Sequence, residues 1–495
     1  MSSSAPDQIA GIENERIGQP VPASLLVGGV WRDAGDRRGF EVHNPATGES
    51  LGDVADATVE DAVSALDAAW DARDAWRAFA PRDRAAVLRR AHDLLRERGE
   101  RIAAVITLES GKTLAEARAE VSISAEFLEW AIERISDVQG HIRTGSHGGY
   151  DIITRYEPIG PSLLISPWNF PLLMPARKLA SALAAGCTAI VKPAAETPLT
   201  ALLLGQVFVD AGVPQGVVSV LPTTRAAEIS TAVMSDARLR KVSFTGSTAV
   251  GTQLLMQAAP NVISSSMELG GDGPLVVLEA ADIEKAARQA IICKFRNAGQ
   301  TCTTANRIIV HDKIADAFTE RFTELASALT VGDGFDAATE VTPMISERQR
   351  ERSLAMIGEA RDGGATILTG GDAIPGGGFF LQPTVVTDLT PEMALAREEI
   401  FAPIAAVYRV SSVDEAVAAA NATSFGLTAY IFSEDLREAL DVADRIESGM
   451  VGINRGLLND VAAPFGGVKS SGLGREGGPD TLHEFMEVKY IALDR

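Results

Sequence analysis

Three cysteines, Cys187, Cys293 and Cys302, are the first candidates for chemistry in this chain of 495 residues. Cys187 (AAGCTAIV) and Cys293 (AIICKF) have small or apolar neighbours, which is typical of buried, unreactive cysteines. Cys302 instead lies in FRNAGQTCTTANR, where a glycine and polar residues follow an expected helix, and this setting favours an accessible thiol. The surroundings of Cys302 alone leave a catalytic and a structural role both open.

Two further segments carry groups that could assist a thiol nucleophile. Glu268 ends a run of serines in MELGG, and the two glycines after it allow the backbone to approach a ligand closely. Its carboxylate could act as a general base, although a solvated surface carboxylate is the commoner role of a single glutamate. Asn169 stands in PWNFP, after an expected strand, where its side-chain amide could donate to an oxyanion or could cap its own turn.

Two segments at expected strand ends could bind a nucleotide. FTGSTAVG contains Gly246, Ser247 and Gly251 at a turn that would place a helix N-terminus near a pyrophosphate. The glycines are not spaced as GxGxxG, so the usual dinucleotide fingerprint is absent. VKPAAETP ends another strand with Lys192, whose ammonium could bind ribose hydroxyls or a phosphate, or could be an ordinary surface cation.

The elements that would position these residues follow from the hydrophobic periodicity. Successive amphipathic helices are expected from Thr58 to Ile135, and glycines followed by an alternating segment predict a hairpin over residues 141–156. Short apolar runs then alternate with helical stretches, which is typical of parallel, doubly wound sheets and predicts two α/β domains. The expected strands are Ser162–Ile165, Ala189–Lys192, Val217–Leu221, Lys241–Phe244, Leu275–Leu278 and Arg307–Val310, and the expected helices of the second series are Asp282–Phe295 and Lys313–Leu329. A last strand over Phe485–Leu493 needs a pairing partner, for which a second subunit is the simplest candidate.

The composition is that of a globular protein, with 46% hydrophobic and 22% charged residues. A formal net charge of -21 would repel a phosphate backbone or an anionic membrane surface, so we expect neither a nucleic-acid nor a membrane partner. No apolar stretch reaches the roughly 18 to 20 residues of a membrane helix, and residues Met1 to Gln19 are expected to form a flexible leader. The few cysteines favour a reducing, cytoplasmic compartment, and we expect no metal site.

Seven segments occur in an order that resembles the aldehyde dehydrogenase superfamily along nearly the whole chain. They are PWNFP, VKPAAETP, FTGSTAVG, MELGG, FRNAGQTCTTANR, EEIFAP and PFGGVKSSGLGREGG. Within the superfamily, KFRNAGQTC and SGLGREGG are most similar to the NAD(P)-dependent succinate-semialdehyde dehydrogenases. The resemblance implies two doubly wound α/β domains with a small β extension. These are a Rossmann-like NAD(P)-binding domain (residues 1–140 and 159–267), a catalytic domain (268–475) and an oligomerisation segment (141–158 and 476–495).

The resemblance also implies roles for the three catalytic candidates. Cys302 would be the nucleophile, Glu268 the general base, and Asn169 with the backbone amide of Cys302 the oxyanion hole. The physical chemistry agrees, because a thiol with a pKa near 8.5 needs help to attack an aldehyde, and the adduct is a thiohemiacetal oxyanion. Each donor aimed at that oxygen is worth on the order of 3 kcal/mol. Transfer of hydride to a nicotinamide would leave a thioester, and Glu268 would activate the water that hydrolyses it to a carboxylic acid.

The cofactor residues implied by the resemblance are Trp168, Lys192, Gly246, Ser247, Glu399 and Phe401. Lys192 would hold the adenosine ribose, the Gly246 turn would lie by the pyrophosphate, and Glu399 with its neighbour Phe401 would hold the nicotinamide ribose. Relatives that prefer NAD usually have glutamate three residues after this lysine, where the chain has Ala195. Loss of that charge predicts that NADP is accepted, and the preference between NAD and NADP stays open because Glu196 is adjacent.

Two arginines bear on the substrate. Arg296 and Arg177 stand at positions where the succinate-semialdehyde dehydrogenases resemble one another in having arginine. Two guanidinium groups could clamp a distal carboxylate, whereas the alternative is a pair of surface arginines in salt bridges. Asn459 occupies the place of a serine that contacts the carboxylate in those relatives, so the length of the ω-carboxy aldehyde is open.

Three other functions compete with oxidation of succinate semialdehyde. A dehydrogenase of neutral or aromatic aldehydes would keep the reaction and is opposed only by the arginine pair. A CoA-acylating enzyme typically lacks the glutamate base, and a non-catalytic family member should have lost the nucleophile or the base, but Cys302 and Glu268 are both present. A homodimer or homotetramer is expected.

Overall fold

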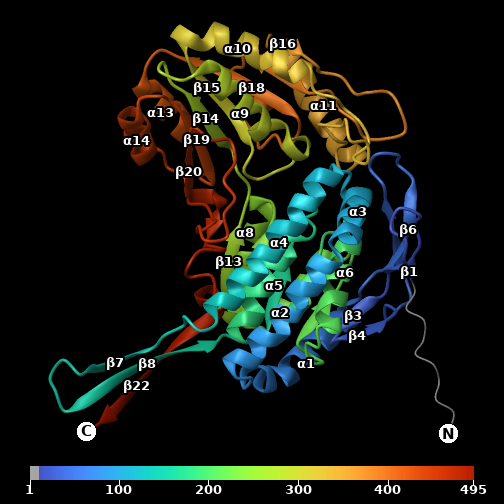
Figure 1. The fold of residues 1–495 in the computed structure, drawn as a ribbon, viewed down its shortest axis with the longest axis vertical. Helices are drawn as coiled ribbons and strands as arrows, with labels where there is room; N and C mark the ends of the chain where they lie inside the picture. The colour runs from blue at the N-terminus through green and yellow to red at the C-terminus, as the bar shows by residue number, and fades with distance from the viewer. Residues whose placement is uncertain (1–10) are drawn as a thin grey trace.

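The computed structural model describes residues 11–495, which form two lobes and a projecting β extension (Figure 1). At the start of this range β1 (Gly11–Ile12) pairs antiparallel with β2 (Val21–Pro22). Ile12 and Ile17 are buried in the core of the first lobe. The expected flexible leader is therefore wrong for residues 11–19, because apolar side chains anchor them, and the rest of that leader lies outside the described residues.

An eight-stranded sheet organises the first lobe. In spatial order its strands are β21 (Gly472–Leu473), β13 (Ser264–Glu268), β12 (Lys241–Thr245), β9 (Ser162–Ile165), β10 (Ala189–Lys192), β11 (Val218–Val220), β3 (Leu25–Val27) and β4 (Val30–Arg32). The strands from β13 to β11 run parallel, and short antiparallel strands close both edges. The winding direction reverses between β9 and β12, which is the position where ligands bind in open α/β sheets.

Helices cover both faces of this sheet. Leu164 points into one core and its neighbours Leu163 and Ile165 point into the other, because side chains alternate along a strand. The first core is closed by α2 (Pro81–Glu97), α3 (Gly99–Ser110), α4 (Leu114–Arg134), α5 (Leu173–Ala185) and α6 (Pro198–Asp210). The second is closed by α1 (Val59–Arg77), α7 (Ala226–Met234) and α8 (Thr248–Ala258). Capping boxes at Thr58 and Thr113 begin α1 and α4.

A seven-stranded sheet organises the second lobe. Its order is β16 (Thr366–Thr369), β17 (Thr384–Thr387), β18 (Ile404–Val410), β15 (Ala305–His311), β14 (Gly273–Val277), β19 (Thr428–Phe432) and β20 (Met450–Ile453). One face packs on α9 (Ile283–Phe295) and α10 (Asp312–Ser327), and the other on α11 (Glu347–Asp362), α12 (Ala394–Arg397), α13 (Val413–Asn421) and α14 (Leu436–Arg445). All strands except β16 pair in parallel. The prediction of two doubly wound α/β units is confirmed.

A three-stranded antiparallel sheet projects from the lower part of the molecule in Figure 1. It contains β7 (His141–Thr144), β8 (Tyr150–Pro158) and β22 (Met486–Asp494), so the expected hairpin and terminal strand are confirmed. The terminal strand pairs with β8 of the same chain along its whole length, which corrects the expectation that a second subunit supplies this partner. A two-stranded hairpin of β5 (Gly39–His43) and β6 (Ser50–Ala55) completes the strands of the N-terminal region.

Within residues 11–495, no helix combines the length and the apolar composition required to cross a membrane. The same residues contain no group of three or more His, Cys, Asp or Glu side chains arranged to hold a metal ion.

Candidate active site

The larger of two adjoining cavities lies where the two lobes meet, and the smaller is lined by residues of the first lobe. Asn169 follows β9, Ser247 follows β12 and Glu268 ends β13, so all three stand at the carboxyl ends of strands in the first sheet. Cys302 comes from the second lobe, just before β15. The larger cavity has a volume of about 600 Å³, and the predicted site residues that line it are Trp168, Asn169, Arg177, Gly246, Ser247, Glu268, Arg296, Cys302, Glu399, Phe401 and Asn459. The smaller cavity, of about 390 Å³, is lined by Lys192 and Ala195.

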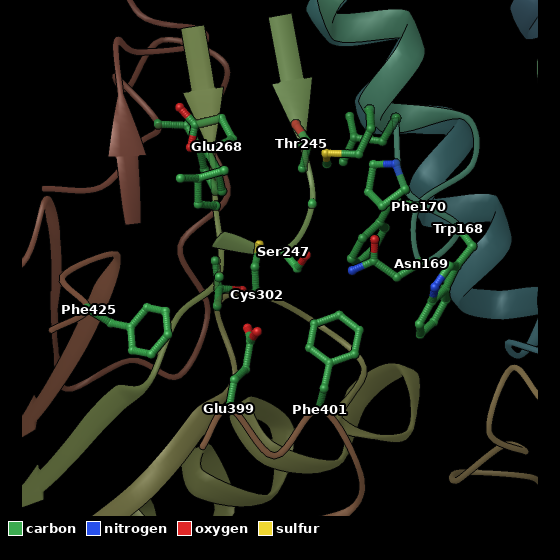
Figure 2. Close-up of a pocket in the computed structure, with 18 of the residues that line it drawn as sticks. Trp168, Asn169, Phe170, Thr245, Ser247, Glu268, Cys302, Glu399, Phe401 and Phe425 are labelled. Atoms are coloured by element: carbon green, nitrogen blue, oxygen red, sulfur yellow. The ribbon is translucent and has the colours of Figure 1, made fainter. Parts of the chain in front are cut away.

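Cys302 is partly exposed and lines the larger cavity (Figure 2). Cys187 and Cys293 are buried. A tight turn before Cys302 places Asn297 and Ala298 at φ of 50° and 53°. Desolvation raises the pKa of the Cys302 thiol to about 12, and the Glu399 carboxyl adds to the shift. The thiol is therefore protonated at neutral pH in this arrangement and needs a base before it can attack.

Asn169 is buried at the end of β9, with its amide directed toward the cavity. Its Nδ2 donates to the backbone carbonyl of Gln300 at 3.0 Å, two residues before Cys302. That bond uses one of the two amide hydrogens and fixes which way the amide faces, because the carbonyl accepts only from the nitrogen. The second hydrogen remains for an oxygen atom in the cavity.

Glu268 is buried, which excludes the solvated surface carboxylate that its sequence context also allowed. Among residues 11–495, neither of its carboxylate oxygens has a hydrogen-bond partner. Burial raises the pKa of Glu268 well above its usual value, and the nearby Glu476 carboxylate adds to the shift. In Figure 2 the Glu268 carboxylate is directed away from the Cys302 thiol, so it must rotate to act there.

The two arginines differ in their surroundings. Arg177 is buried on α5, forms an ion pair with Glu476, and lies 4.5 Å from the ring centre of Phe465. Glu476 also accepts a hydrogen bond from buried Lys178, so its charge is shared between two cations. Arg177 therefore reaches the cavity with its guanidinium already paired.

Arg296 is only partly buried, and no carboxylate in residues 11–495 lies within 4.0 Å of its guanidinium. Its guanidinium carbon lies 5.7 Å from the ring centre of Phe170, another residue of the cavity wall. Asn459 is exposed and lines the same cavity. Arg296 thus brings an uncompensated positive charge to the larger cavity.

The smaller cavity joins the larger one at Pro167, Thr245 and Gly246, which line both. Lys192 is buried in it, and its Nζ donates to the Pro193 carbonyl at 3.0 Å. Desolvation lowers the pKa of Lys192 to about 8, while the carboxylate of Glu196 acts in the opposite direction. Ala195 and Glu196 both line this cavity, so a carboxylate does stand near Lys192.

Glu399 and Phe401 of the second lobe and Trp168 of the first lobe line the larger cavity near its junction with the smaller one (Figure 2). Glu399 accepts a hydrogen bond from the Gly271 amide at 2.9 Å, and burial raises the pKa of Glu399 to about 7. Phe401 has a φ of 51° and meets the Trp168 ring edge to face, with ring centres 5.5 Å apart. The aromatic rings of Trp168 and Phe401 and the hydrogen-bond-accepting carboxylate of Glu399 therefore line the same cavity as the Cys302 thiol.

These residues fit a dinucleotide. Ser247 caps α8, and the turn at Gly246 lines both cavities, so the free backbone amides of a helix N-terminus lie where an anionic pyrophosphate would pass. The buried Lys192 ammonium stands in the cavity on one side of this turn, and Glu399 with Phe401 stands on the other. The two cavities thus offer one site for each half of a dinucleotide, with the pyrophosphate at the Gly246 turn between them.

Sequence reasoning missed several buried charged residues around the site. They are Lys112, Glu120, Lys178 and Glu476, and the half-buried Glu116 stands beside them. Glu476 belongs to the GREGG segment, but nothing local indicated that it would pair with Lys178, which is 298 residues away in the chain. Lys112 lies in the loop between α3 and α4, eight residues before Glu120, so neither their pairing nor their burial could be read from the i,i+3 and i,i+4 spacings of helical ion pairs.

The fold and the joined cavities are those of a two-lobed, nucleotide-binding α/β enzyme. The model of the aldehyde dehydrogenase family matches residues 31–491, and the chain belongs to this family. It is 47% identical to a succinate-semialdehyde dehydrogenase of Paenarthrobacter nicotinovorans, over 90% of this chain and 98% of the relative. It is 40% identical to a glutarate-semialdehyde dehydrogenase of Pseudomonas aeruginosa, over 94% and 96% of the two chains. The crystal structure of an NADP-dependent enzyme of Escherichia coli superposes with a TM-score of 0.95 at 39% identity, covering 98% of this chain and all of that one.

Proposed function

We propose that this enzyme oxidises succinate semialdehyde, or a close ω-carboxy aldehyde, to the dicarboxylic acid with NAD or NADP as the oxidant. The observation that carries the proposal is that the Cys302 thiol and the unpaired Arg296 guanidinium line the same cavity of about 600 Å³. A thiol can bond to the aldehyde carbon while a guanidinium binds the far carboxylate. The similarity to a succinate-semialdehyde dehydrogenase supports the substrate class.

Carbon–sulfur bond formation is assigned to Cys302. The thiol loses its proton to a base as sulfur attacks the aldehyde carbon, and the carbonyl oxygen becomes an oxyanion. The free hydrogen of the Asn169 amide and the backbone amide of Cys302 donate to that oxygen, each with a contribution on the order of 3 kcal/mol. Because Gln300 already orients the Asn169 amide, little reorganisation is needed when charge develops.

Hydrolysis of the resulting thioester is assigned to Glu268. Its raised pKa makes it a stronger base than an exposed carboxylate, so it accepts a proton from water more readily. Water adds to the thioester carbon, Cys302 leaves as the thiolate, and the acid is released. This step distinguishes the proposal from CoA acylation, in which water must be excluded.

The cofactor would be held by Lys192 at the adenosine ribose, Gly246 and Ser247 at the pyrophosphate, and Glu399, Phe401 and Trp168 around the nicotinamide ribose and ring. When bound, the nicotinamide supplies the acceptor for the hydride that leaves the substrate carbon. Ala195 brings no charge against a 2'-phosphate, and a relative in structure is described as NADP dependent, which supports use of NADP beside NAD.

We also propose that the chain is divided into a cofactor-binding domain and a catalytic domain, each built around one of the two large sheets. Residues 1–140 and 159–267 would bind the cofactor and residues 268–475 would carry the nucleophile, because the first sheet lies mainly in the former and the second in the latter. Residues 141–158 and 476–495 would join subunits into a homodimer or homotetramer. A cytoplasmic location is proposed because the free thiol of Cys302 requires a reducing compartment.

A second candidate substrate is glutarate semialdehyde. Asn459 lines the cavity and a glutarate-semialdehyde dehydrogenase is 40% identical, so a chain longer by one methylene belongs in the same test.

The test is a steady-state comparison of succinate semialdehyde, glutarate semialdehyde and butanal with each cofactor. We expect kcat/KM for one of the two carboxylate aldehydes to exceed that for butanal by about 100-fold, since charge-assisted bonds contribute about 1.5–3 kcal/mol. Equal efficiency for butanal would overturn the substrate assignment. Cys302→Ala should abolish turnover and leave the circular dichroism spectrum unchanged, whereas the matched variant Cys293→Ala should keep activity.

A further inference from the structure

A buried lysine outside the cavity holds the backbone of Asn169. Lys112 follows α3 and is 1% exposed. Its Nζ donates to the backbone carbonyl of Asn169 at 2.8 Å and lies 4.1 Å from the ring centre of Phe170. The Lys112 ammonium is therefore bound to the peptide group between Asn169, the proposed oxyanion donor, and Phe170.

The counter-ion of Lys112 holds the other end of the same loop. Glu120 on α4 is buried and accepts from Lys112 Nζ through Oε2. Its Oε1 accepts from the amides of Leu172 and Leu173 at 2.8 and 3.0 Å, where α5 begins. Free amides and the positive end of the helix dipole favour a carboxylate there. The two residues of this buried ion pair thus form hydrogen bonds with both ends of the loop from Asn169 to Leu173.

The same helix also holds the turn that precedes the nucleophile. Glu116, one helical turn before Glu120, accepts from the Asn297 amide at 2.7 Å. Asn297 Nδ2 donates to the Asn169 carbonyl and to the Gln300 carbonyl, both at 3.2 Å. The Gln300 carbonyl in turn accepts from the Asn169 side-chain amide. The oxyanion loop and the loop of Cys302 are therefore tied to one another through α4.

We propose that Lys112 and Glu120 are positioning residues for the reaction, forming with Glu116 a brace that sets the Asn169 amide relative to Cys302. The inference rests on the proposed function, in which Asn169 donates to the oxyanion. A donor stabilises the transition state only when it already points at the position of the developing charge, and shifts of about 1 Å can cost about 100-fold in rate. A brace of this kind acts on the rate of the chemical step and has little effect on substrate binding.

The experiment is a double-mutant cycle between Lys112→Met and Asn169→Ala in the full-length enzyme. The rate measured is that of NAD(P)H formation in the first turnover at saturating aldehyde and cofactor. Lys112→Met should lower this rate at least about tenfold, with KM for both substrates within about threefold of wild type. In the Asn169→Ala background the same change should cost less than about twofold, because the donor that Lys112 positions is gone.

The cycle separates failure of the brace from failure of the proposed function. If Asn169→Ala keeps the wild-type rate, the oxyanion role itself fails. If Asn169→Ala is slow but Lys112→Met is not, or if the two losses multiply, the brace is overturned. Asp61→Asn is the matched control, because Asp61 is also buried, pairs with Arg32 and accepts backbone amides away from both cavities. It should lower stability and leave the first-turnover rate within about twofold.

Asn297→Gly keeps the proposal testable if Lys112→Met does not fold. Glycine adopts the φ of 50° at this position without strain, so only the side-chain amide and its two bonds are lost. The brace predicts a slower first turnover in the wild-type background and no additional loss beside Asn169→Ala. An unchanged first-turnover rate in Asn297→Gly would overturn the link between the two loops.

Discussion

The Cys302 thiol rests in its uncharged state, and the Arg177 guanidinium rests in an ion pair. Burial raises the pKa of Cys302 to about 12, and the pKa of Glu268 also lies well above its usual value. Arg177 is compensated by Glu476, which leaves Arg296 as the cation available to a ligand among the arginines that sequence reasoning selected. Chemistry in the cavity therefore requires proton transfer and a rotation of Glu268, while substrate recognition can use a charge that is already exposed.

Because Arg177 is ion-paired and Arg296 is not, we expect substitutions of the two arginines to have different effects on activity. Arg296→Ala should lower kcat/KM for succinate semialdehyde by about 10- to 100-fold and leave butanal within about twofold, because it removes charge-assisted bonds to the carboxylate alone. Arg177→Ala should impair both aldehydes and lower the melting temperature, since it leaves Glu476 buried with one counter-ion fewer. Steady-state kinetics and thermal unfolding of the two variants check this, and equal selectivity loss in both would contradict it.

The buried carboxyl of Glu268 predicts a pH-dependent stability. Its pKa is raised in the folded enzyme, so the native state binds more protons than the unfolded chain above about pH 4.5, and the free energy of unfolding falls as pH rises. Glu268→Gln removes this titration. We expect the stability of the variant relative to wild type to increase from about pH 5 to pH 8 in urea unfolding experiments.

Glu279→Gln is the control for this pH dependence. Lys313 lowers the pKa of Glu279, so its titration lies below the tested interval and the stability difference should stay flat from about pH 5 to pH 8. A flat difference for Glu268→Gln as well would show that Glu268 titrates normally in the folded protein.

At the scale of elements, the ends of β9, β10, β12 and β13 supply most of the first lobe's contribution to the cavities. The loop after β10 decides the environment of Lys192, with Ala195 and Glu196 at the cavity wall. The N-terminus of α8 faces the junction of the cavities from the end of β12. On the proposed cofactor assignment, short strand-to-helix connections would set the preference between NAD and NADP.

Ala195→Glu should change the cofactor preference. A carboxylate at this position accepts bonds from ribose hydroxyls and repels a 2'-phosphate, so kcat/KM with NADP should fall at least about tenfold relative to NAD. Ala195→Gln is the matched variant of equal size without the charge, and its preference should change by less than about threefold. An unchanged ratio in Ala195→Glu would place the 2'-phosphate elsewhere.

For the whole molecule, the projecting sheet is the feature that exposes apolar side chains beyond the two lobes. Ile142, Val488, Tyr490 and Leu493 are apolar or aromatic and more than half exposed, although they lie on paired strands. Exposed apolar side chains on an extension of this kind mark an association surface.

We therefore expect a self-associated enzyme whose sedimentation changes with this sheet. The double variant Val488→Glu and Tyr490→Glu should shift the main species to a smaller mass, because charge opposes burial of these positions. Leu368→Glu, at an exposed apolar position on β16, should sediment as wild type does. Analytical ultracentrifugation measures both, and an unchanged mass for the double variant would place the interface elsewhere.

Local pattern determined much of this protein. Hydrophobic periodicity located the helices after Thr58, the strands at Ser162–Ile165 and Ala189–Lys192, and the terminal strand, because each depends on neighbours within one element. The chemical character of the Cys302 segment and of the PWNFP loop was likewise visible in sequence. The anchored residues 11–19 and the partner of the terminal strand were not, since both depend on distant surfaces.

Tertiary structure alone decided which charges are free. Arg177 and Arg296 look equivalent in sequence, but the fold brings Glu476 to Arg177 and leaves Arg296 without a carboxylate among the described residues. Lys112 and Glu120 could have been a solvated pair, yet packing of α4 against α5 buries them on the Asn169 loop. The physical reason is that burial and ion pairing depend on where remote segments meet, and residue type and local spacing do not contain that information.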